Sequence, residues 1–149
     1  ILDGNLLSVT ETWSGLTSLT TDSHIHCCIA PPGTTSVALP FTGAGFPRVA
    51  TGNGVLAGTY THVFDLTLAS TYNAAFVTAN GGTTAGAETA LINGLLFGQA
   101  YTNIHTQNFP TGEIRGLLVG IPEPTTLALF GAGLFGLFSF GMMRRRAAA

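Results

Sequence analysis

Residue types that bind metals or carry redox chemistry gather in one short stretch, residues 21–28, which reads Thr-Asp-Ser-His-Ile-His-Cys-Cys. It holds both cysteines of the chain and two of its four histidines. If a strand runs through it, side chains alternate between faces, so that His24, His26 and Cys28 share one face and Cys27 points the other way. Imidazoles and thiolates are ligands that copper and zinc prefer. The stretch therefore predicts one half of a metal site.

His105 lies in a second strand-like segment, far along the chain, and offers a third imidazole. If the two strands face each other, His105 joins His24 and His26, and Cys28 completes an N₃S set suited to copper or zinc. A different interpretation is that these histidines hydrogen-bond to the backbone and to loops, and so hold the strands together. The residue types alone leave both interpretations open.

The adjacent cysteines allow a second kind of chemistry. Cys27 and Cys28 could form a vicinal disulfide in an oxidising compartment, which would remove Cys28 from any metal. The two residues could also remain free thiols or form intermolecular disulfides. Two cysteines do not make a disulfide framework that could hold a whole domain together.

The charge content excludes one large class of partners. Charged residues make up only 8% of the chain, against about 25% in an average soluble domain, and lysine is absent. A protein with so few cations cannot neutralise many phosphates, so we expect no binding to nucleic acid. The sequence also has no nucleophile elbow, no phosphate-binding loop and no supported pair of catalytic carboxylates. We therefore expect a protein that is not an enzyme.

Short strand-like segments separated by turn residues follow one another along the first 119 residues. This spacing predicts a mainly β protein, an antiparallel Ig-like or superoxide-dismutase-like β-sandwich with one or two short helices. The expected strands are residues 6–13, 21–28, 36–41, 60–68, 100–106 and 113–119, and the expected helical segments are residues 73–78 and 88–97.

The character of the chain changes after residue 119. Prolines in the segment of residues 120–124 break secondary structure and predict a linker. Residues 125–143 are then 19 residues without a charge, and about 20 apolar residues span a bilayer as a helix. We therefore expect a C-terminal transmembrane helix over residues 125–143.

A cluster of positive charge follows this helix within residues 144–149. Arg144, Arg145 and Arg146 are adjacent, and such charge marks the cytoplasmic side of a membrane span. The body of the protein is therefore expected to be exported and anchored outside the cytoplasm.

Three parts of the tail stand in a recognisable order: Pro122-Glu123-Pro124, the apolar span, and the arginine cluster. This arrangement closely resembles the PEP-CTERM sorting signal of Gram-negative bacteria. The resemblance implies that an exosortase, a membrane cysteine transpeptidase-like enzyme, recognises the motif and cuts near it. The cytoplasmic membrane would then be a transient anchor, and the body would reach the cell surface or the extracellular space. Such signals accompany exopolysaccharide and biofilm matrix production, so matrix components are implied as partners.

The body, residues 1–119, resembles the CHRD domain, a module named from chordin and common in bacterial secreted proteins. The family has an upstream strand region, so we expect that the first strands of the domain are missing before Ile1. The resemblance implies a β fold and an extracytoplasmic location rather than an activity. The matching segments are residues 15–16, 23–26, 64–68, 101–106 and 110–116.

These observations predict an exported cell-surface or extracellular-matrix protein, sorted by exosortase, with a non-enzymatic binding or structural role. A second hypothesis, from a different class, is an extracytoplasmic protein that binds copper or zinc through its histidines and Cys28.

Overall fold

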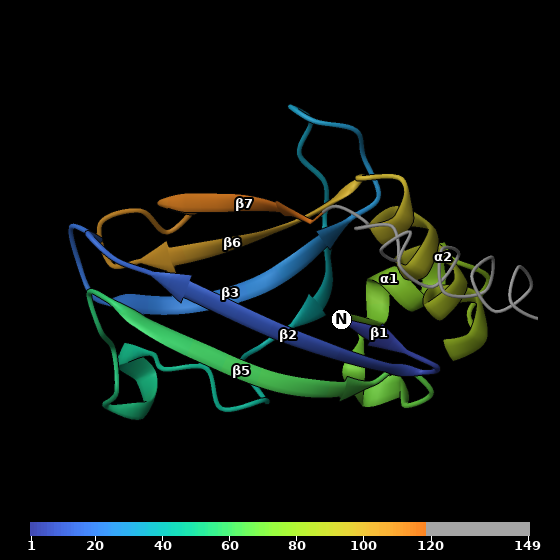
Figure 1. The fold of residues 1–149 in the computed structure, drawn as a ribbon, viewed down its shortest axis with the longest axis horizontal. Helices are drawn as coiled ribbons and strands as arrows, with labels where there is room; N and C mark the ends of the chain where they lie inside the picture. The colour runs from blue at the N-terminus through green and yellow to red at the C-terminus, as the bar shows by residue number, and fades with distance from the viewer. Residues whose placement is uncertain (119–149) are drawn as a thin grey trace, which may run out of the picture.

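Two antiparallel sheets make up most of the structure, a computed structural model that describes residues 1–118 (Figure 1). The predicted linker, transmembrane helix and basic end lie outside the described residues. The first sheet has the strand order β1-β2-β5 and the second the order β4-β3-β6-β7. The strands are β1 (Leu2–Asp3), β2 (Leu6–Trp13), β3 (Thr20–Cys27), β4 (Val37–Pro40), β5 (Gly58–Asp65), β6 (Ala100–Thr106) and β7 (Ile114–Leu118).

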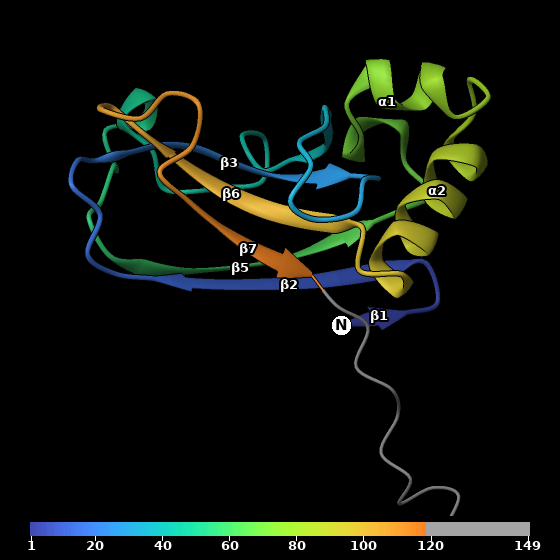
Figure 2. The ribbon, with the colours of Figure 1, turned by 90° about the horizontal axis from the view of Figure 1, so that it is seen from above.

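The two sheets lie face to face as layers (Figure 2). Alternate residues of β2 point between them, because side chains on successive strand positions face opposite sides. An aromatic cluster of Phe41, Phe46, Tyr60 and Phe64 fills part of this space, with ring centroids 5.2–6.4 Å apart. The mainly β architecture with a core between two sheets agrees with the predicted β-sandwich, whereas its likeness to immunoglobulin or superoxide dismutase domains stays a prediction.

The two α-helices lie together at one end of the sheets (Figure 1). They are α1 (Ala74–Ala79) and α2 (Thr84–Leu96), and two short 3₁₀ helices, η1 (Val49–Thr51) and η2 (Ala69–Thr71), lie in loops. The side chains of Asn73 and Thr83 cap α1 and α2 by accepting hydrogen bonds from backbone N–H groups. Across residues 1–118, no helix combines the length and the apolar character needed to cross a membrane.

The largest differences from the expected element boundaries lie at two places, and the others are one or two residues. The helix expected over residues 88–97 begins at Thr84, because the Thr83 hydroxyl accepts a hydrogen bond from the N–H of Gly86 and caps it there. The strand expected over residues 60–68 ends at Asp65, whose carboxylate accepts hydrogen bonds from the backbone N–H and the hydroxyl of Thr67. Such a local side-chain turn competes with the continuing strand.

Candidate metal centre

Antiparallel pairing of β3 with β6 brings three histidines together on the outer face of the second sheet. Ser23 and Ile25 of β3 point into the sandwich, so His24 and His26 point out. In the register of the pair, His24 lies opposite Asn103 and His26 opposite Tyr101. The pairing therefore places β6 side chains directly beside the two β3 imidazoles.

His105 completes the cluster from β6. One ring nitrogen from each of His24, His26 and His105 lies within 4.8 Å of the others. The ring centroid of His24 is 4.6 Å from that of His26 and 4.5 Å from that of His105. The predicted meeting of the three imidazoles is therefore present in the structure.

Backbone carbonyls of two loops orient two of these rings. The Nδ1–H of His26 donates to the carbonyl of Thr35 at 2.6 Å, and the Nδ1–H of His105 donates to the carbonyl of Pro110 at 2.8 Å. A carbonyl can only accept, so both Nδ1 atoms carry a proton, and in the neutral form of each ring the Nε2 atom keeps its lone pair. A carbonyl on one imidazole nitrogen and a free lone pair on the other is the arrangement found in metal-binding histidines.

His24 is the most central and the least satisfied member of the cluster. It exposes only 9% of its surface, and its Nδ1 is buried without a hydrogen-bond partner among residues 1–118. Burial, together with the neighbouring His105 and His26, lowers the pKa of His24 to about 4. The ring is therefore neutral at neutral pH, which is the form that binds metals.

Asn103 lies between the other two histidines, on the same face of β6 as His105. Its Oδ1 is 3.1 Å from Nε2 of His26 and 3.1 Å from Nε2 of His105. Only 8% of Asn103 is exposed. Its residue type did not mark Asn103 as a site residue in the sequence. The one sequence signal was its position two residues before His105, which places both side chains on the same face of a strand.

Arg115 of β7 holds one of the loops over the cluster. Its guanidinium donates to the carbonyls of Pro32 at 2.8 Å and Gly33 at 3.2 Å. It also lies over the ring of Tyr101, 4.8 Å from the centroid, and His26 stacks on that same ring at 4.6 Å. The stack and the loop together fix the position of the His26 imidazole.

The cluster opens to solvent on one side. A cleft of about 510 Å³ is lined by His26, Asn103 and His105, with Arg115 at its wall. A small ion can therefore reach the imidazoles of His26 and His105 from solvent, and His24 lies behind them, outside the lining of the cleft.

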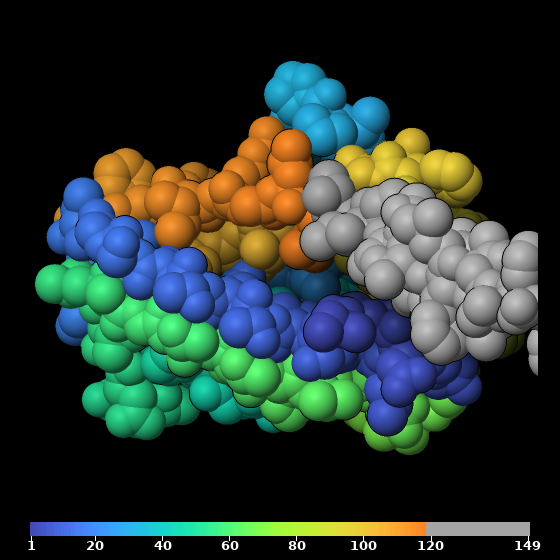
Figure 3. All heavy atoms as spheres, viewed as in Figure 1, coloured from blue at the N-terminus to red at the C-terminus, as the bar shows by residue number. Residues whose placement is uncertain are grey.

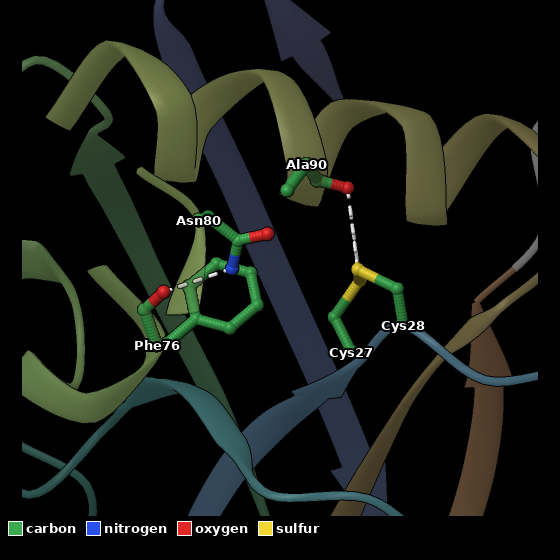
Figure 4. Close-up of a disulfide and its surroundings, with 5 residues drawn as sticks. All are labelled: Cys27, Cys28, Phe76, Asn80 and Ala90. Carbon is green, nitrogen blue, oxygen red and sulfur yellow. Dashed lines mark hydrogen bonds between the residues drawn. A yellow bond between two sulfur atoms is a disulfide. The ribbon is translucent and has the colours of Figure 1, made fainter. Parts of the chain in front are cut away.

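Cys28 is not part of this cluster, so the structure does not bring the predicted fourth ligand to the three histidines. β3 ends at Cys27, so strand alternation no longer places the next residue on the histidine face. The structure joins Cys27 to Cys28 in a vicinal disulfide, one of the arrangements that adjacent cysteines allow. Both sulfurs lie against the carbonyl of Ala90 in α2, at 3.8 Å and 3.3 Å (Figure 4).

A buried carboxylate lies between the two sheets, against the face of β3 that is opposite to the histidines. The sequence did not indicate it. Glu11 of β2 accepts hydrogen bonds from the hydroxyls of Ser23, at 3.0 Å, and Thr102. It lines a second cavity of about 310 Å³, whose walls include β2 and β7, and Figure 3 shows the hollow between these strands. Burial raises the pKa of Glu11, and the two hydroxyls oppose that shift.

The structure thus defines a class of protein: a two-sheet β domain with a solvent-accessible histidine cluster on one sheet. The family model of the CHRD domain matches residues 1–118, and the chain belongs to that family. A second family model, the PEP-CTERM protein-sorting motif, matches residues 120–146. Both resemblances read from the sequence are therefore confirmed. Searches of curated proteins and of solved structures gave no match.

The sorting motif bears directly on the location of the protein. It supports an exported protein that exosortase processes, and it is consistent with anchoring in the membrane before that step.

Proposed function

We propose that this protein is a non-enzymatic binding protein of the bacterial cell surface or extracellular matrix, and that its CHRD domain binds one copper or zinc ion. The ligands are His24, His26 and His105. The observation that carries the metal assignment is the convergence of three imidazole nitrogens within 4.8 Å on one face of the sheet.

The chemistry of the donor set fits a borderline divalent ion. Imidazole nitrogen suits Zn²⁺ and Cu²⁺, and metal-bound histidines usually donate their other ring N–H to a carbonyl. His26 and His105 each make that hydrogen bond. His24 adds a third imidazole whose buried Nδ1 has no partner in the described part of the chain, and a cation bound at that nitrogen would satisfy it.

The surface or matrix location is supported by the order of the domains. The histidine cluster lies within residues 1–118, and the matched sorting motif begins at residue 120. Cleavage near that motif leaves the whole metal site in the exported part. An exported domain that keeps its site after processing suits a role among exopolysaccharide and other matrix components.

The non-enzymatic role is supported by what the sequence carries. It shows no nucleophile elbow, phosphate-binding loop or supported pair of catalytic carboxylates. The buried carboxylate of Glu11 lies on the opposite face of β3 from the histidines, because Ser23, its partner, points into the sandwich. A metal-binding role therefore accounts for the histidine cluster, and no catalysed reaction is needed to explain it.

Metal analysis of the full chain, purified in detergent without a histidine tag, tests this proposal. We expect one equivalent of copper or zinc per chain, and affinity lowered at least about hundredfold in His24→Ala and His105→Ala, since each removes a ligand. His62→Ala is the matched control, because His62 lies on β5 of the other sheet. The proposal is refuted if neither metal co-purifies or binds tightly and His26→Ala produces only a loss of stability.

A further inference from the structure

We propose that Asn103 is the fourth protein ligand of this metal, through its side-chain Oδ1, so that the site is an N₃O set instead of the N₃S set that the sequence predicted. This inference rests on the proposed metal site. It assigns a specific role to a residue that the histidine cluster alone does not include.

The distances fit a four-coordinate site. With metal–ligand bonds of about 2.0–2.1 Å, two ligand atoms of a tetrahedron lie about 3.3 Å apart. Oδ1 of Asn103 is 3.1 Å from Nε2 of His26 and 3.1 Å from Nε2 of His105. Two edges of the coordination tetrahedron are therefore already near their bound length.

The hydrogen-bond partners of the cluster support the same assignment. The Nδ1 atoms of His26 and His105 both donate to carbonyls, so their Nε2 atoms carry lone pairs when the rings are neutral. These lone pairs face Oδ1 of Asn103, which is also an acceptor. Three acceptors turned toward one point repel each other. Protons on the Nε2 atoms or a turned amide would relieve that repulsion, and a metal ion between the three atoms satisfies all of them at once.

The backbone holds Asn103 in place for this role. It lies opposite His24 in the β3–β6 ladder and opposite Arg115 in the β6–β7 ladder, so β6 is fixed on both edges. Gly112 leaves room for the amide, because a Cβ there would lie 2.7 Å from Nδ2 of Asn103. A ligand that is oriented before the metal arrives loses little conformational entropy on binding.

The N₃O ligand set also narrows the range of metal ions that the site is expected to bind. Soft thiolates select Cu⁺, whereas imidazole suits Zn²⁺ and Cu²⁺, and an amide oxygen is a harder donor that does not favour the soft Cu⁺ ion. With the sulfur of Cys28 held in the disulfide, residues 1–118 offer no thiolate near the three histidines. We therefore expect the site to bind the divalent ions and to discriminate against Cu⁺.

The test compares two variants of Asn103 in the full chain, using Zn²⁺ and Cu²⁺ titrated against a chelator of known affinity. Asn103→Leu removes the oxygen at similar volume and should weaken binding about tenfold or more. Asn103→Asp supplies an anionic oxygen and should tighten binding, with a changed electron paramagnetic resonance spectrum of bound Cu²⁺. Asn93→Leu, at an exposed position of α2, is the matched control.

Each outcome decides between the proposals. If the wild-type chain binds neither metal, the metal site and this inference both fail. If the wild-type chain binds metal, and both Asn103 variants keep its affinity and its Cu²⁺ spectrum, only the inference fails. The Asn103 amide would then be a hydrogen-bond partner of the imidazoles. Should Asn103→Leu not fold, Asn103→Asp still separates these results.

Discussion

Gly94 of α2 marks the closest approach between the helix and the end of β3. It is buried, and a Cβ built on it would overlap Sγ of Cys27 and lie 3.0 Å from Sγ of Cys28. We predict that Gly94→Ala destabilises the protein although alanine is the better helix former. The effect matters for the site because β3 carries His24 and His26 just before this contact.

The magnitude follows from two opposing terms. Overpacking costs about 1–3 kcal/mol, and the upper end applies because sulfurs held in a disulfide cannot rotate away. Replacing glycine by alanine inside a helix stabilises the helix by about 1 kcal/mol. The net loss for Gly94→Ala is therefore about 2 kcal/mol, which lowers the Tm by about 8 °C for a domain of this size.

A double-mutant cycle isolates the contact. In a Cys27→Ala/Cys28→Ala background the sulfurs are gone, so Gly94→Ala should stabilise the chain by up to about 1 kcal/mol. Thermal unfolding followed by circular dichroism measures all four chains. Gly43→Ala is the control, since a Cβ at that exposed glycine meets no atom of the described residues within 4 Å. An equal loss from Gly94→Ala in both backgrounds would refute the packing described here.

Two further predictions concern the buried carboxylate and the tail. Because burial raises the pKa of Glu11 above its ordinary value of 4.5, the folded state keeps the proton at pH values where the unfolded chain has lost it. Stability should therefore fall as the pH rises from about 4.5 through the raised pKa, and Glu11→Gln should flatten that decline in urea unfolding measured between about pH 4 and about pH 8. If stability depends on pH in the same way in the wild-type chain and in Glu11→Gln, this prediction is wrong. For the tail, mass spectrometry of the mature surface protein should find a C-terminus near Pro122-Glu123-Pro124. A surface form that retains Arg144–Arg146 would count against cleavage.

Local periodicity predicted much of the fold. The strand expected over residues 100–106 has the bounds of β6, because alternation and flanking turn residues are local properties of the chain. The same alternation did not place Cys28 correctly on the histidine face. Alternation holds only while the strand continues, and β3 ends one residue before Cys28. Helix α2 was expected four residues too late because the capping role of Thr83 depends on a turn that periodicity does not register.

The candidate site was predicted only in part, for a related reason. His24 and His26 share a face by spacing alone, but the distance from them to His105 depends on the register of β3 against β6. The carbonyls of Thr35 and Pro110 come from loops, and every residue has a carbonyl, so no sequence pattern distinguishes them. Asn103 gains its role only from its position between two imidazoles.

The sequence by itself determined the family of the domain and the sorting of the protein. Both depend on contiguous motifs, and the tail motif, residues 120–146, acts as a linear signal. Only the tertiary structure decided which residues form the histidine cluster and that the sulfurs of Cys27 and Cys28 lie against α2 instead. The physical reason is that a coordination site requires atoms within a few ångströms of one another, and pairing between distant strands sets those distances.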